Sequence, residues 1–308
     1  MLELRARTGE TTTGLPVSVN AAPPPDLAPF IGRFFITIID QPAAQQVEDI
    51  LLNETAMVRV LVRGEWDAWE RPRGWRRFDG PLLFGPQRVA MRVRARGSMA
   101  VAGFAIRPGG WFGLDPRPAH RVADRLERLD GSWGEALAAA CAAIDDHPGT
   151  VDRLIAAVRA RVAGLNGRAD PVMHDFERMA RADPGVSVAQ AAERLGLTHR
   201  ALQHRVRTHF GHVPKLVLRR SRFLDMAAVM RGLAVPDADA LAAMRFYDAS
   251  HLNKEFRLFV DMTPAAFQRA ATPLMTPGLE VRQRRKLDDL GLPAAPWLRQ
   301  GSNPVQAR

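Results

Sequence analysis

In the first third of the chain, apolar and polar residues alternate with the period of a β-strand. Between residues 88 and 96, Val89, Met91, Val93 and Ala95 are separated mostly by arginines, which is typical of a strand with one solvent-exposed face. Three further runs are apolar enough to form strands, at 34–39, 57–62 and 99–106. Turns are expected between the runs, at Gly85-Pro86, Gly97-Ser98 and Pro108-Gly109-Gly110. Regularly spaced short strands predict a small β-barrel or β-sandwich.

After residue 130 the apolar spacing becomes that of helices. Ser132 and Glu135 form a predicted capping box before an Ala-rich segment. Thr150 is a predicted N-cap for a helix whose apolar stripe includes Leu154 and Val158. Two roles remain open for these helices, which could pack on the β-rich module or pair two subunits.

Residues 170–210 contain an ordered series of helix start and stop signals. Asp170 is a predicted N-cap followed by a first-turn proline, and Ser187 begins a short helix. Gly196 ends that helix, and Thr198 begins a second one that runs to about residue 209. The small residue Ala192 lies four positions before the glycine and lets two helices approach closely. The whole arrangement is typical of a helix-turn-helix unit.

The same signals recur further along the chain. Pro214 begins a long predicted helix that extends to about residue 231. Residues 238–244 predict a short helix, and Asp248 is the predicted N-cap of the next one. Thr263, followed by a proline, begins a closing helix. The sequence therefore predicts two helix-turn-helix units joined by one long helix.

The second helix of each predicted unit has a polar face, and in both helices its residues follow the first one by three, four and seven positions. In the first unit these residues are Arg200, Gln203, His204 and Arg207, and in the second they are Ser250, Asn253, Lys254 and Arg257. Arginine and glutamine can bind guanine and adenine edges through two hydrogen bonds in the major groove. The predicted base-reading residues are Arg200, Gln203, His204, Arg207, Ser250, Asn253 and Lys254. The predicted phosphate contacts are Thr198, Arg219, Arg222 and Arg257.

The charge distribution agrees with a nucleic-acid partner. The chain has 43 Lys and Arg against 33 Asp and Glu, a net charge of +10 and a pI of about 11.1. Thirteen basic and six acidic residues lie between Arg194 and Arg269, so more than half of the excess falls in a quarter of the chain. Nearly all of the positive charge is arginine, which a GC-rich genome also favours, so net charge alone is a weak indicator.

Three motifs follow one another in the C-terminal part: Phe210-Gly211-His212-Val213-Pro214-Lys215, Phe246-Tyr247-Asp248-Ala249-Ser250-His251-Leu252 and Met262-Thr263-Pro264. Arg219, Arg222-Phe223, Phe256-Arg257 and Phe267 accompany them. In this order they resemble the AraC/XylS family of transcriptional regulators. The resemblance implies two units that read successive major-groove segments on one face of the duplex, with half-sites about 34 Å apart.

The N-terminal half is similar to a sensor-like domain of unknown function that is often fused to this module. The similarity rests on Pro25-Asp26-Leu27-Ala28-Pro29-Phe30, Gly85-Pro86 and Pro108-Gly109-Gly110. Leu241 and Arg245 depart from the family pattern, because the second unit normally has a small residue and a glycine there. His204 also stands where arginine or lysine is common. Since arginine is strained in a left-handed turn, we expect the first unit to supply most of the specificity.

These patterns predict an α+β chain of two domains. The expected parts are a disordered lead-in at 1–25, a β-rich effector or dimerisation domain with helices at 26–165, an all-α DNA-binding domain at 170–271 and a Pro-rich tail at 272–308. The tail arginines, Arg282 among them, are expected to be solvated. The predicted function is that of a transcription regulator that binds double-stranded DNA. Candidate further partners are a small-molecule effector, RNA polymerase and a second copy of the chain. The alternative is a module whose second unit has decayed and that acts through one half-site or through protein partners.

No pattern indicates an enzyme, a cofactor or a metal site. Cys141 is the single cysteine, and it lies among alanines with no helix start or base nearby to lower its pKa. His199, His204 and His209 are spaced by five residues, about 140° on a helix, so they do not share one face. No apolar run approaches the ~18 residues of a membrane span, and the N-terminus lacks the apolar core of a signal peptide. We therefore expect a cytoplasmic protein that associates with the bacterial nucleoid through DNA.

Overall fold

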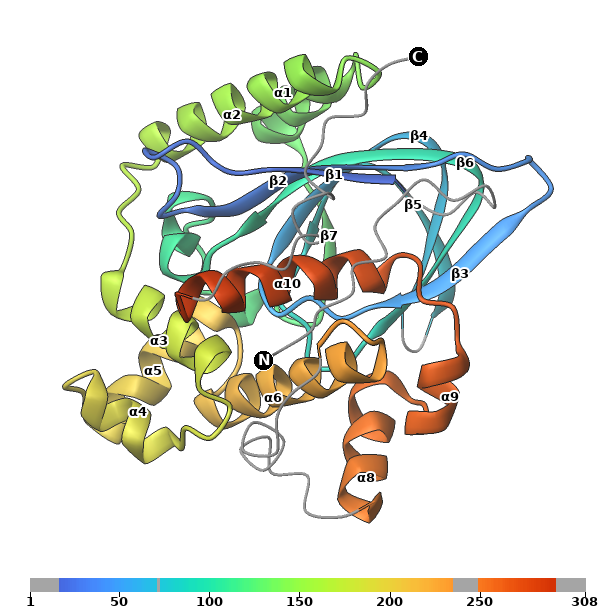
Figure 1. Cartoon of the computed structure of the whole chain (residues 1–308). Coiled ribbons are helices and arrows are strands. Elements are labelled where there is room, and N and C mark those ends of the chain that lie inside the picture. Colours follow the sequence, from blue (N-terminus) through green and yellow to red (C-terminus); the bar gives the residue numbers. More distant parts are fainter. Residues whose placement is uncertain (1–16, 71–72, 235–248, 292–308) are drawn as a thin grey trace.

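The computed structural model describes residues 17–70, 73–234 and 249–291, and these form an α+β fold (Figure 1). The strands are β1 (Val17–Ala21), β2 (Ile31–Ile39), β3 (Gln46–Leu51), β4 (Met57–Glu70), β5 (Gly74–Phe84), β6 (Met91–Ile106) and β7 (Leu126–Arg128). Two 3-10 helices, η1 (Pro108–Gly113) and η2 (Ala119–Arg121), lie between β6 and β7. The α-helices are α1 (Gly131–Cys141), α2 (His147–Gly164), α3 (Pro171–Ala182), α4 (Val188–Arg194), α5 (His199–Phe210), α6 (Pro214–Met230), α8 (Ala249–Val260), α9 (Pro264–Arg269) and α10 (Met275–Asp289).

The strands form one antiparallel sheet in the order β1-β2-β6-β4-β5-β7, with β3 also paired to β6. The long strand β6 pairs with β3 through residues 91–96 and with β2 through residues 99–106. The turn expected at Gly97-Ser98 is wrong, because both residues lie inside β6. Gly97 has a φ of +63°, which only glycine adopts easily, and it interrupts the ladder between the two partners without reversing the chain.

The small barrel or sandwich predicted from the sequence is corrected to a single seven-stranded sheet, which is open within the described residues. Within the described residues β1 and β7 end the path of strands, and no pairing joins them. Consecutive residues belong to different apolar clusters: Phe34, Val58 and Phe104 to one, Phe35, Met57 and Ala105 to the other. Because successive side chains of a strand point to opposite faces, this one sheet carries a core on each face.

Helices α1 and α2 cover one face of the sheet. Their residues Leu137, Leu154 and Val158 are buried in the same cluster as Phe104 of β6. Of the two roles left open by the sequence, packing on the β-rich module is therefore observed. The capping box predicted at Ser132 is wrong, since α1 begins at Gly131 and no side chain caps it.

The helix starts predicted in the C-terminal region are confirmed where the structure describes them. Asp170, Ser187, Thr198 and Thr263 each accept a hydrogen bond from a backbone amide of the helix that they precede. Ser187 also forms a full capping box with Gln190. Gly196 has a φ of +63°, as expected for the turn between α4 and α5. The predicted short helix at 238–244 and the cap Asp248 lie outside the described residues.

The Pro-rich tail predicted from residue 272 contains the helix α10, which crosses between the sheet and α6 (Figure 1). Its buried apolar residues are Met275, Leu279 and Leu287. Arg282, expected to be solvated, is buried and pairs with Asp225 of α6 and Glu54 of the β3–β4 connection. The nitrogen of Lys286 lies 2.7 Å from Asp225. Sequence alone predicts solvent exposure for Arg282 and its basic neighbours, because the carboxylates that pair with them lie far away along the chain.

The 3-10 helix η1 joins the sheet module to the first helix-turn-helix unit. The carbonyl of Gly109 accepts a hydrogen bond of 2.8 Å from the amide of Asp170, the N-cap of α3. A Cβ atom at Gly109 would lie 2.6 Å from the ring of His174. His209 of α5 is hydrogen-bonded to the Pro108 carbonyl at 2.9 Å. The Pro-Gly-Gly segment is therefore a contact surface for α3 and α5, beyond the turn that the sequence predicts.

Candidate nucleic-acid interface

Helices α4 and α5 form the first unit around an apolar core shared with α3 and α6. The buried residues of α5 are Leu202, Val206 and Phe210. The ring of Phe210 meets that of Phe176 edge to face at 5.2 Å. Ala191 and Ala192 of α4 are buried in the same cluster, as expected for small residues where two helices approach closely. This packing fixes which side of α5 faces outward.

The outward side of α5 carries the predicted base-reading residues. Arg200, Gln203, His204 and Arg207 are all exposed. One end of this face lies against the sheet module, because η2, which carries His120, packs against α5. Burial lowers the pKa of His120, and the charges of Arg207 and Arg121 lower it further. The contact therefore places a neutral imidazole beside the polar face at neutral pH.

Helix α6 connects the first unit to the second. Val217 and Leu218 belong to the cluster of the first unit, and Phe223 and Leu224 belong to the cluster of α8 and α9. The Phe223 ring stacks on Phe259 of α8 with centroids 4.7 Å apart. The long helix predicted to join two units therefore packs against the first unit at one end and against α8 and α9 at the other.

Helix α8 has the same division of faces as α5. Phe256, Phe259 and Val260 are buried. The exposed residues include the predicted set, which is Ser250, Asn253, Lys254 and Arg257. The side-chain amide of Asn253 donates to the Ala249 carbonyl at 2.8 Å, within its own helix. Leu241 and Arg245 lie outside the described residues, so the expected imbalance between the two units stays a prediction.

The four predicted phosphate contacts differ in their surroundings. Thr198 and Arg257 are exposed, and the Thr198 hydroxyl accepts from the Ala201 amide. Arg219 is bound to the buried carboxylate of Glu255, and the Arg222 guanidinium donates to the Pro184 carbonyl at 3.5 Å. Two of the four side chains are thus engaged inside the fold.

Beneath the first unit, the buried carboxylate of Glu177 on α3 is neutralised by several cations. Burial by itself would raise its pKa, but Arg285, His174, Arg107 and Arg181 hold that pKa well below its usual range. The nitrogens of Arg285 and Arg107 lie 2.7 and 3.0 Å from its oxygens. Because Arg107 follows β6 and Arg285 belongs to α10, this one carboxylate connects three parts of the chain.

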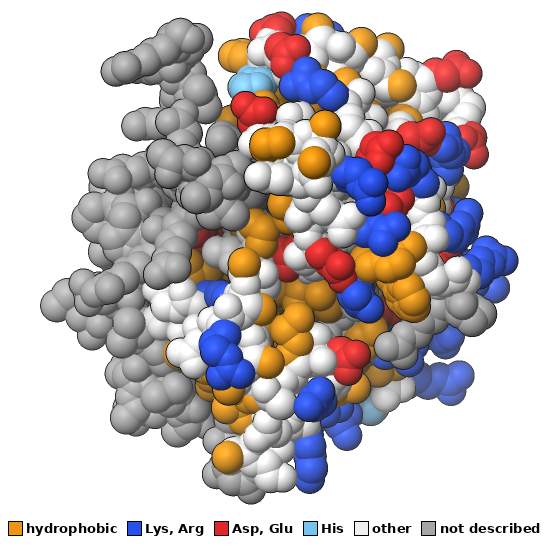
Figure 2. Space-filling model, turned by 90° about the vertical axis from the view of Figure 1, so that its right-hand side faces the viewer, with side chains coloured by type: hydrophobic (Ala, Val, Ile, Leu, Met, Phe, Trp, Pro, Cys, Tyr) orange, Lys and Arg blue, Asp and Glu red, His pale blue; other side chains and the backbone are white. Residues whose placement is uncertain are grey.

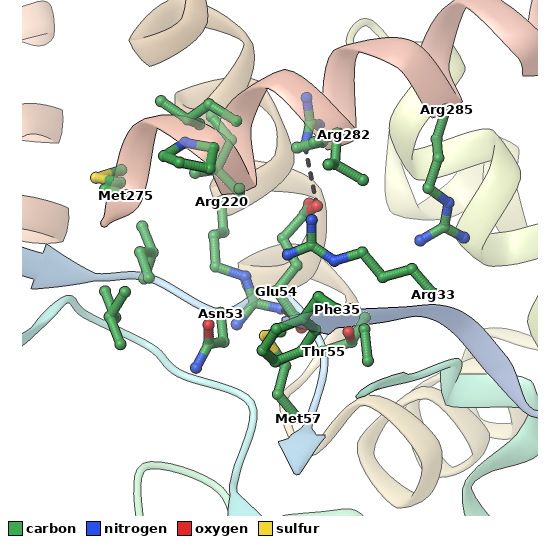
Figure 3. A pocket seen from close by; sticks show the side chains of 18 of the residues that line it. Arg33, Phe35, Asn53, Glu54, Thr55, Met57, Arg220, Met275, Arg282 and Arg285 are labelled. Atoms are coloured by element: carbon green, nitrogen blue, oxygen red, sulfur yellow. Dashed lines mark hydrogen bonds and ion pairs between the residues drawn. The ribbon is translucent and has the colours of Figure 1, made fainter. Parts of the chain in front are cut away.

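A cavity of about 140 Å³ lies between the sheet, α6 and α10 (Figure 3). Arg33 of β2, Arg59 of β4 and Arg220 of α6 line it, and none of them belongs to a site that the sequence predicts. In the sequence, an arginine within a strand pattern is expected on the solvent-exposed face of the strand. Only the placement of α6 and α10 over this face of the sheet encloses these side chains.

A wider groove of about 1440 Å³ lies between the sheet and the end of α8. Trp69, Arg92, Glu48 and Val260 are among its lining residues. Figure 2 looks onto this side of the molecule, where apolar side chains occupy a hollow and charges of both signs surround it. The mixed charges do not favour one class of ligand.

The described residues contain no group of three or more His, Cys, Asp or Glu that could hold a metal ion. Burial raises the pKa of the Cys141 thiol to about 12, so the thiolate that nucleophilic chemistry needs is scarce at neutral pH. Among the helices of the described part, none has the length and apolar character needed to cross a membrane.

No protein-family model matches the chain, and no curated protein matches its sequence. Among solved structures, the chain is similar to ToxT from Vibrio cholerae, with a TM-score of 0.44 and 9% identity over 76% of this chain and 97% of that one. Wild-type ToxT from Vibrio cholerae with a bound unsaturated fatty acid gives a TM-score of 0.42 and 10% identity, over 79% and 97%. The AraC-like transcriptional activator CuxR gives 0.32 and 14%, over 69% and 87%. Because these similarities are low, functional conclusions rest on the chain's own geometry.

Proposed function

We propose that the chain is a sequence-specific DNA-binding transcription regulator in which α5 and α8 read successive major-groove segments of double-stranded DNA. The observation that carries this proposal is the pair of exposed polar faces, at matching offsets, on helices whose opposite faces are buried. Helix α6, which joins the units, has 17 residues. A helix of that length spans about 25 Å, comparable with the ~34 Å between major-groove segments one turn apart.

Base reading is assigned mainly to Arg200 and Gln203, because both are exposed and both can make two hydrogen bonds to a base. His204, Arg207, Ser250, Asn253 and Lys254 complete the proposed base-reading set. Phosphate contact is assigned to Thr198 and Arg257, which are exposed. For Arg219 and Arg222 we instead propose a positioning role, since each is bound to a group of the fold.

The proposed division of labour follows the two parts of the chain. Residues 26–165 form the domain for effector binding or dimerisation, and residues 170–271 form the DNA-binding domain. The contacts of η1 and η2 with α3 and α5 support a path by which a ligand in the first domain influences the second. Recruitment of RNA polymerase and formation of a homodimer belong to the same proposal and are testable by pull-down and by light scattering.

Footprinting on the DNA upstream of the protein's own gene, across a salt series, tests the proposal. The double variant Arg200→Ala/Gln203→Ala should lose at least tenfold in affinity for the specific site, because each two-hydrogen-bond contact is worth about 1–3 kcal/mol. Arg178→Ala on α3 is the matched control, since Arg178 is exposed and its one ion pair within the described residues is with its helix neighbour Asp175. Equal affinity of the double variant and the control would contradict the assignment.

The alternative is a regulator whose second unit has decayed and makes no base contact. The same footprint separates the two, because one engaged unit protects about half as much DNA as two. If both units bind, Asn253→Ala/Lys254→Ala should shorten the protected stretch. A short footprint that this variant leaves unchanged would support the alternative, which acts through one half-site or through protein partners.

A further inference from the structure

The cavity beneath α10 has an excess of positive charge. Its lining includes six arginines and two glutamates among the described residues: Arg33, Arg59, Arg181, Arg220, Arg282 and Arg285, with Glu54 and Glu177. Arg181 and Arg285 pair with Glu177 at 3.2 and 2.7 Å, and Arg282 pairs with Glu54 at 2.9 Å. The ion pairs of the described residues give no carboxylate partner to Arg33, Arg59 or Arg220.

Buried hydrogen-bond donors around the cavity lack acceptors. The Nε atom of Arg59 is buried without a partner, and its Nη2 atom reaches only the sulfur of Met57 at 3.6 Å. The Nε atom of Arg220 is also unpartnered, although its other nitrogens donate to two backbone carbonyls. Asn53 is 7% exposed, and its Nδ2 atom has no partner. A buried donor left unpaired is unfavourable, so the site favours a ligand that supplies acceptors.

The charges persist in the cavity at neutral pH. Burial lowers the pKa of Arg33 to about 9, with further lowering by Arg59, Arg285 and Arg284. Burial likewise lowers the pKa of Arg59 and of Arg220 to about 10. These values still lie above neutral pH, so all three guanidiniums stay protonated. A bound anion would offset the charges of Arg33 and Arg59, for which the described residues provide no carboxylate partner.

Apolar side chains form a large part of the remaining cavity wall. Phe35, Leu51, Met57, Leu224, Met275 and Leu279 contribute to it. The Arg59 guanidinium lies 5.2 Å from the centroid of the Phe35 ring, so charged and apolar surfaces adjoin. The volume of about 140 Å³ is close to the ~150 Å³ that accommodates a guest of benzene size. A compact guest therefore matches the space better than a long acyl chain.

We infer that this cavity binds a small organic carboxylate, with the anionic group beside Arg33 and Arg59 and a compact apolar body against Phe35 and Met57. Figure 3 shows Arg33 and Arg220 reaching toward the same region from opposite walls, with Asn53 nearby. The binding site rests on the cavity alone. Its role as the effector site rests on the proposed function.

The cavity also connects the sheet to the DNA-binding helices. Arg220 belongs to α6 and donates to the carbonyl of Glu54, while the carboxylate of Glu54 pairs with Arg282 of α10. A carboxylate held in this space lies among groups from β2, β4, α6 and α10. Because α6 joins the two units, occupancy of the cavity stabilises one placement of α5 relative to α8.

Isothermal titration of the full chain with benzoate and with its neutral analogue benzamide tests the inference. Benzoate should bind at least tenfold more tightly than benzamide, and hexadecanoate should not bind. Arg59→Met should weaken benzoate binding at least tenfold, because it removes the charge and the unpaired donor while keeping the apolar stem. Arg96→Met is the matched control, since Arg96 is an exposed strand arginine outside the cavity, and it should leave binding unchanged.

Equal binding of benzoate and benzamide, no binding of benzoate to the wild type, or unchanged binding to Arg59→Met overturns the inference. Thermal melting checks that the variants fold, and Arg33→Met provides a second variant with the same expected loss. The footprint in the absence of benzoate separates the two proposals. Benzoate binding without any DNA footprint contradicts the proposed function alone, whereas an intact footprint without benzoate binding contradicts the carboxylate site alone.

Discussion

Arg219 of α6 holds Glu255 of α8 in a two-pronged ion pair, with Nη2 2.5 Å from Oε1 and Nε 3.0 Å from both carboxylate oxygens. The Glu255 side chain is 3% exposed, while that of Arg219 is 40% exposed. The hydrogen bond to Glu255 raises the pKa of Arg219. Because Glu255 lies between the predicted base-reading residues and the buried face of α8, this pair fixes how α8 is oriented on α6.

Glu255→Gln should lower the free energy of unfolding by about 1–2 kcal/mol. The loss is smaller than the ~3–5 kcal/mol of a fully buried pair, because water reaches the freed arginine. DNA protection should weaken over the half-site bound by α8 and remain over the other. Urea denaturation and footprinting measure the two effects. Glu193→Gln on α4 serves as control, since Glu193 is exposed. Equal weakening over both half-sites would argue against a role in orienting α8.

Two glycine-to-alanine substitutions should differ in how much free energy of unfolding they remove and in which helix they disturb. A Cβ at Gly109 would lie 2.6 Å from His174 and 2.7 Å from the backbone oxygen of Asp170, so α3 must move away from η1. We expect Gly109→Ala to cost about 2–3 kcal/mol and to speed hydrogen exchange in α3. Gly196 has a φ of +63° and open space at its Cβ, so Gly196→Ala should cost only about 1 kcal/mol. Similar exchange in α3 for both variants would disprove the close approach at η1.

Asp49 of β3 should make stability depend on pH. Its carboxylate accepts from the amides of Leu274 and Met275 at the start of α10, and burial raises its pKa from 3.8 to about 6. The folded state then binds the proton more tightly than the unfolded chain, so this contribution to stability is present at acid pH and lost as the pH rises through 6.

The wild type should therefore lose about 2 kcal/mol relative to Asp49→Asn between pH 4.5 and 7. Chemical denaturation at several pH values measures this difference. Asp152→Asn, at an exposed position of α2, should show no such trend. If the wild type instead gained stability over this range relative to Asp49→Asn, the raised pKa assigned to Asp49 would be wrong.

Arg282→Met tests whether α10 belongs to the core. The substitution leaves Asp225, which is 1% exposed, with Lys286 as its remaining cation, and it removes the partner of Glu54. We expect a loss of about 3 kcal/mol in the free energy of unfolding. Asp288→Asn, at an exposed position of the same helix, should change it by less than about 0.5 kcal/mol. If Arg282→Met lowered the free energy of unfolding as little as Asp288→Asn does, the solvated arginine expected from the sequence would be supported instead.

The amino-acid sequence determined the local structure of the C-terminal part. Caps at Asp170, Ser187, Thr198 and Thr263 and the left-handed turn at Gly196 depend on neighbouring backbone atoms, so they could be read along the chain. The same holds for the division of α5 into a buried and a polar face, since helical period alone fixes which residues share a side. The base-reading faces of the candidate site were therefore predictable as surfaces, and their function remains a proposal.

Tertiary structure decided the features that depend on partners distant in sequence. Gly97 could begin a turn or a bulge, and only the pairing of β6 with both β3 and β2 selects the bulge. Arg282 looks like any solvated arginine until Asp225 and Glu54 surround it. Arg59 lies in the run predicted as a strand at 57–62, and only the placement of α6 and α10 encloses its side chain. An ion pair or a cavity forms between groups that packing brings together, and packing depends on the whole chain rather than on local spacing.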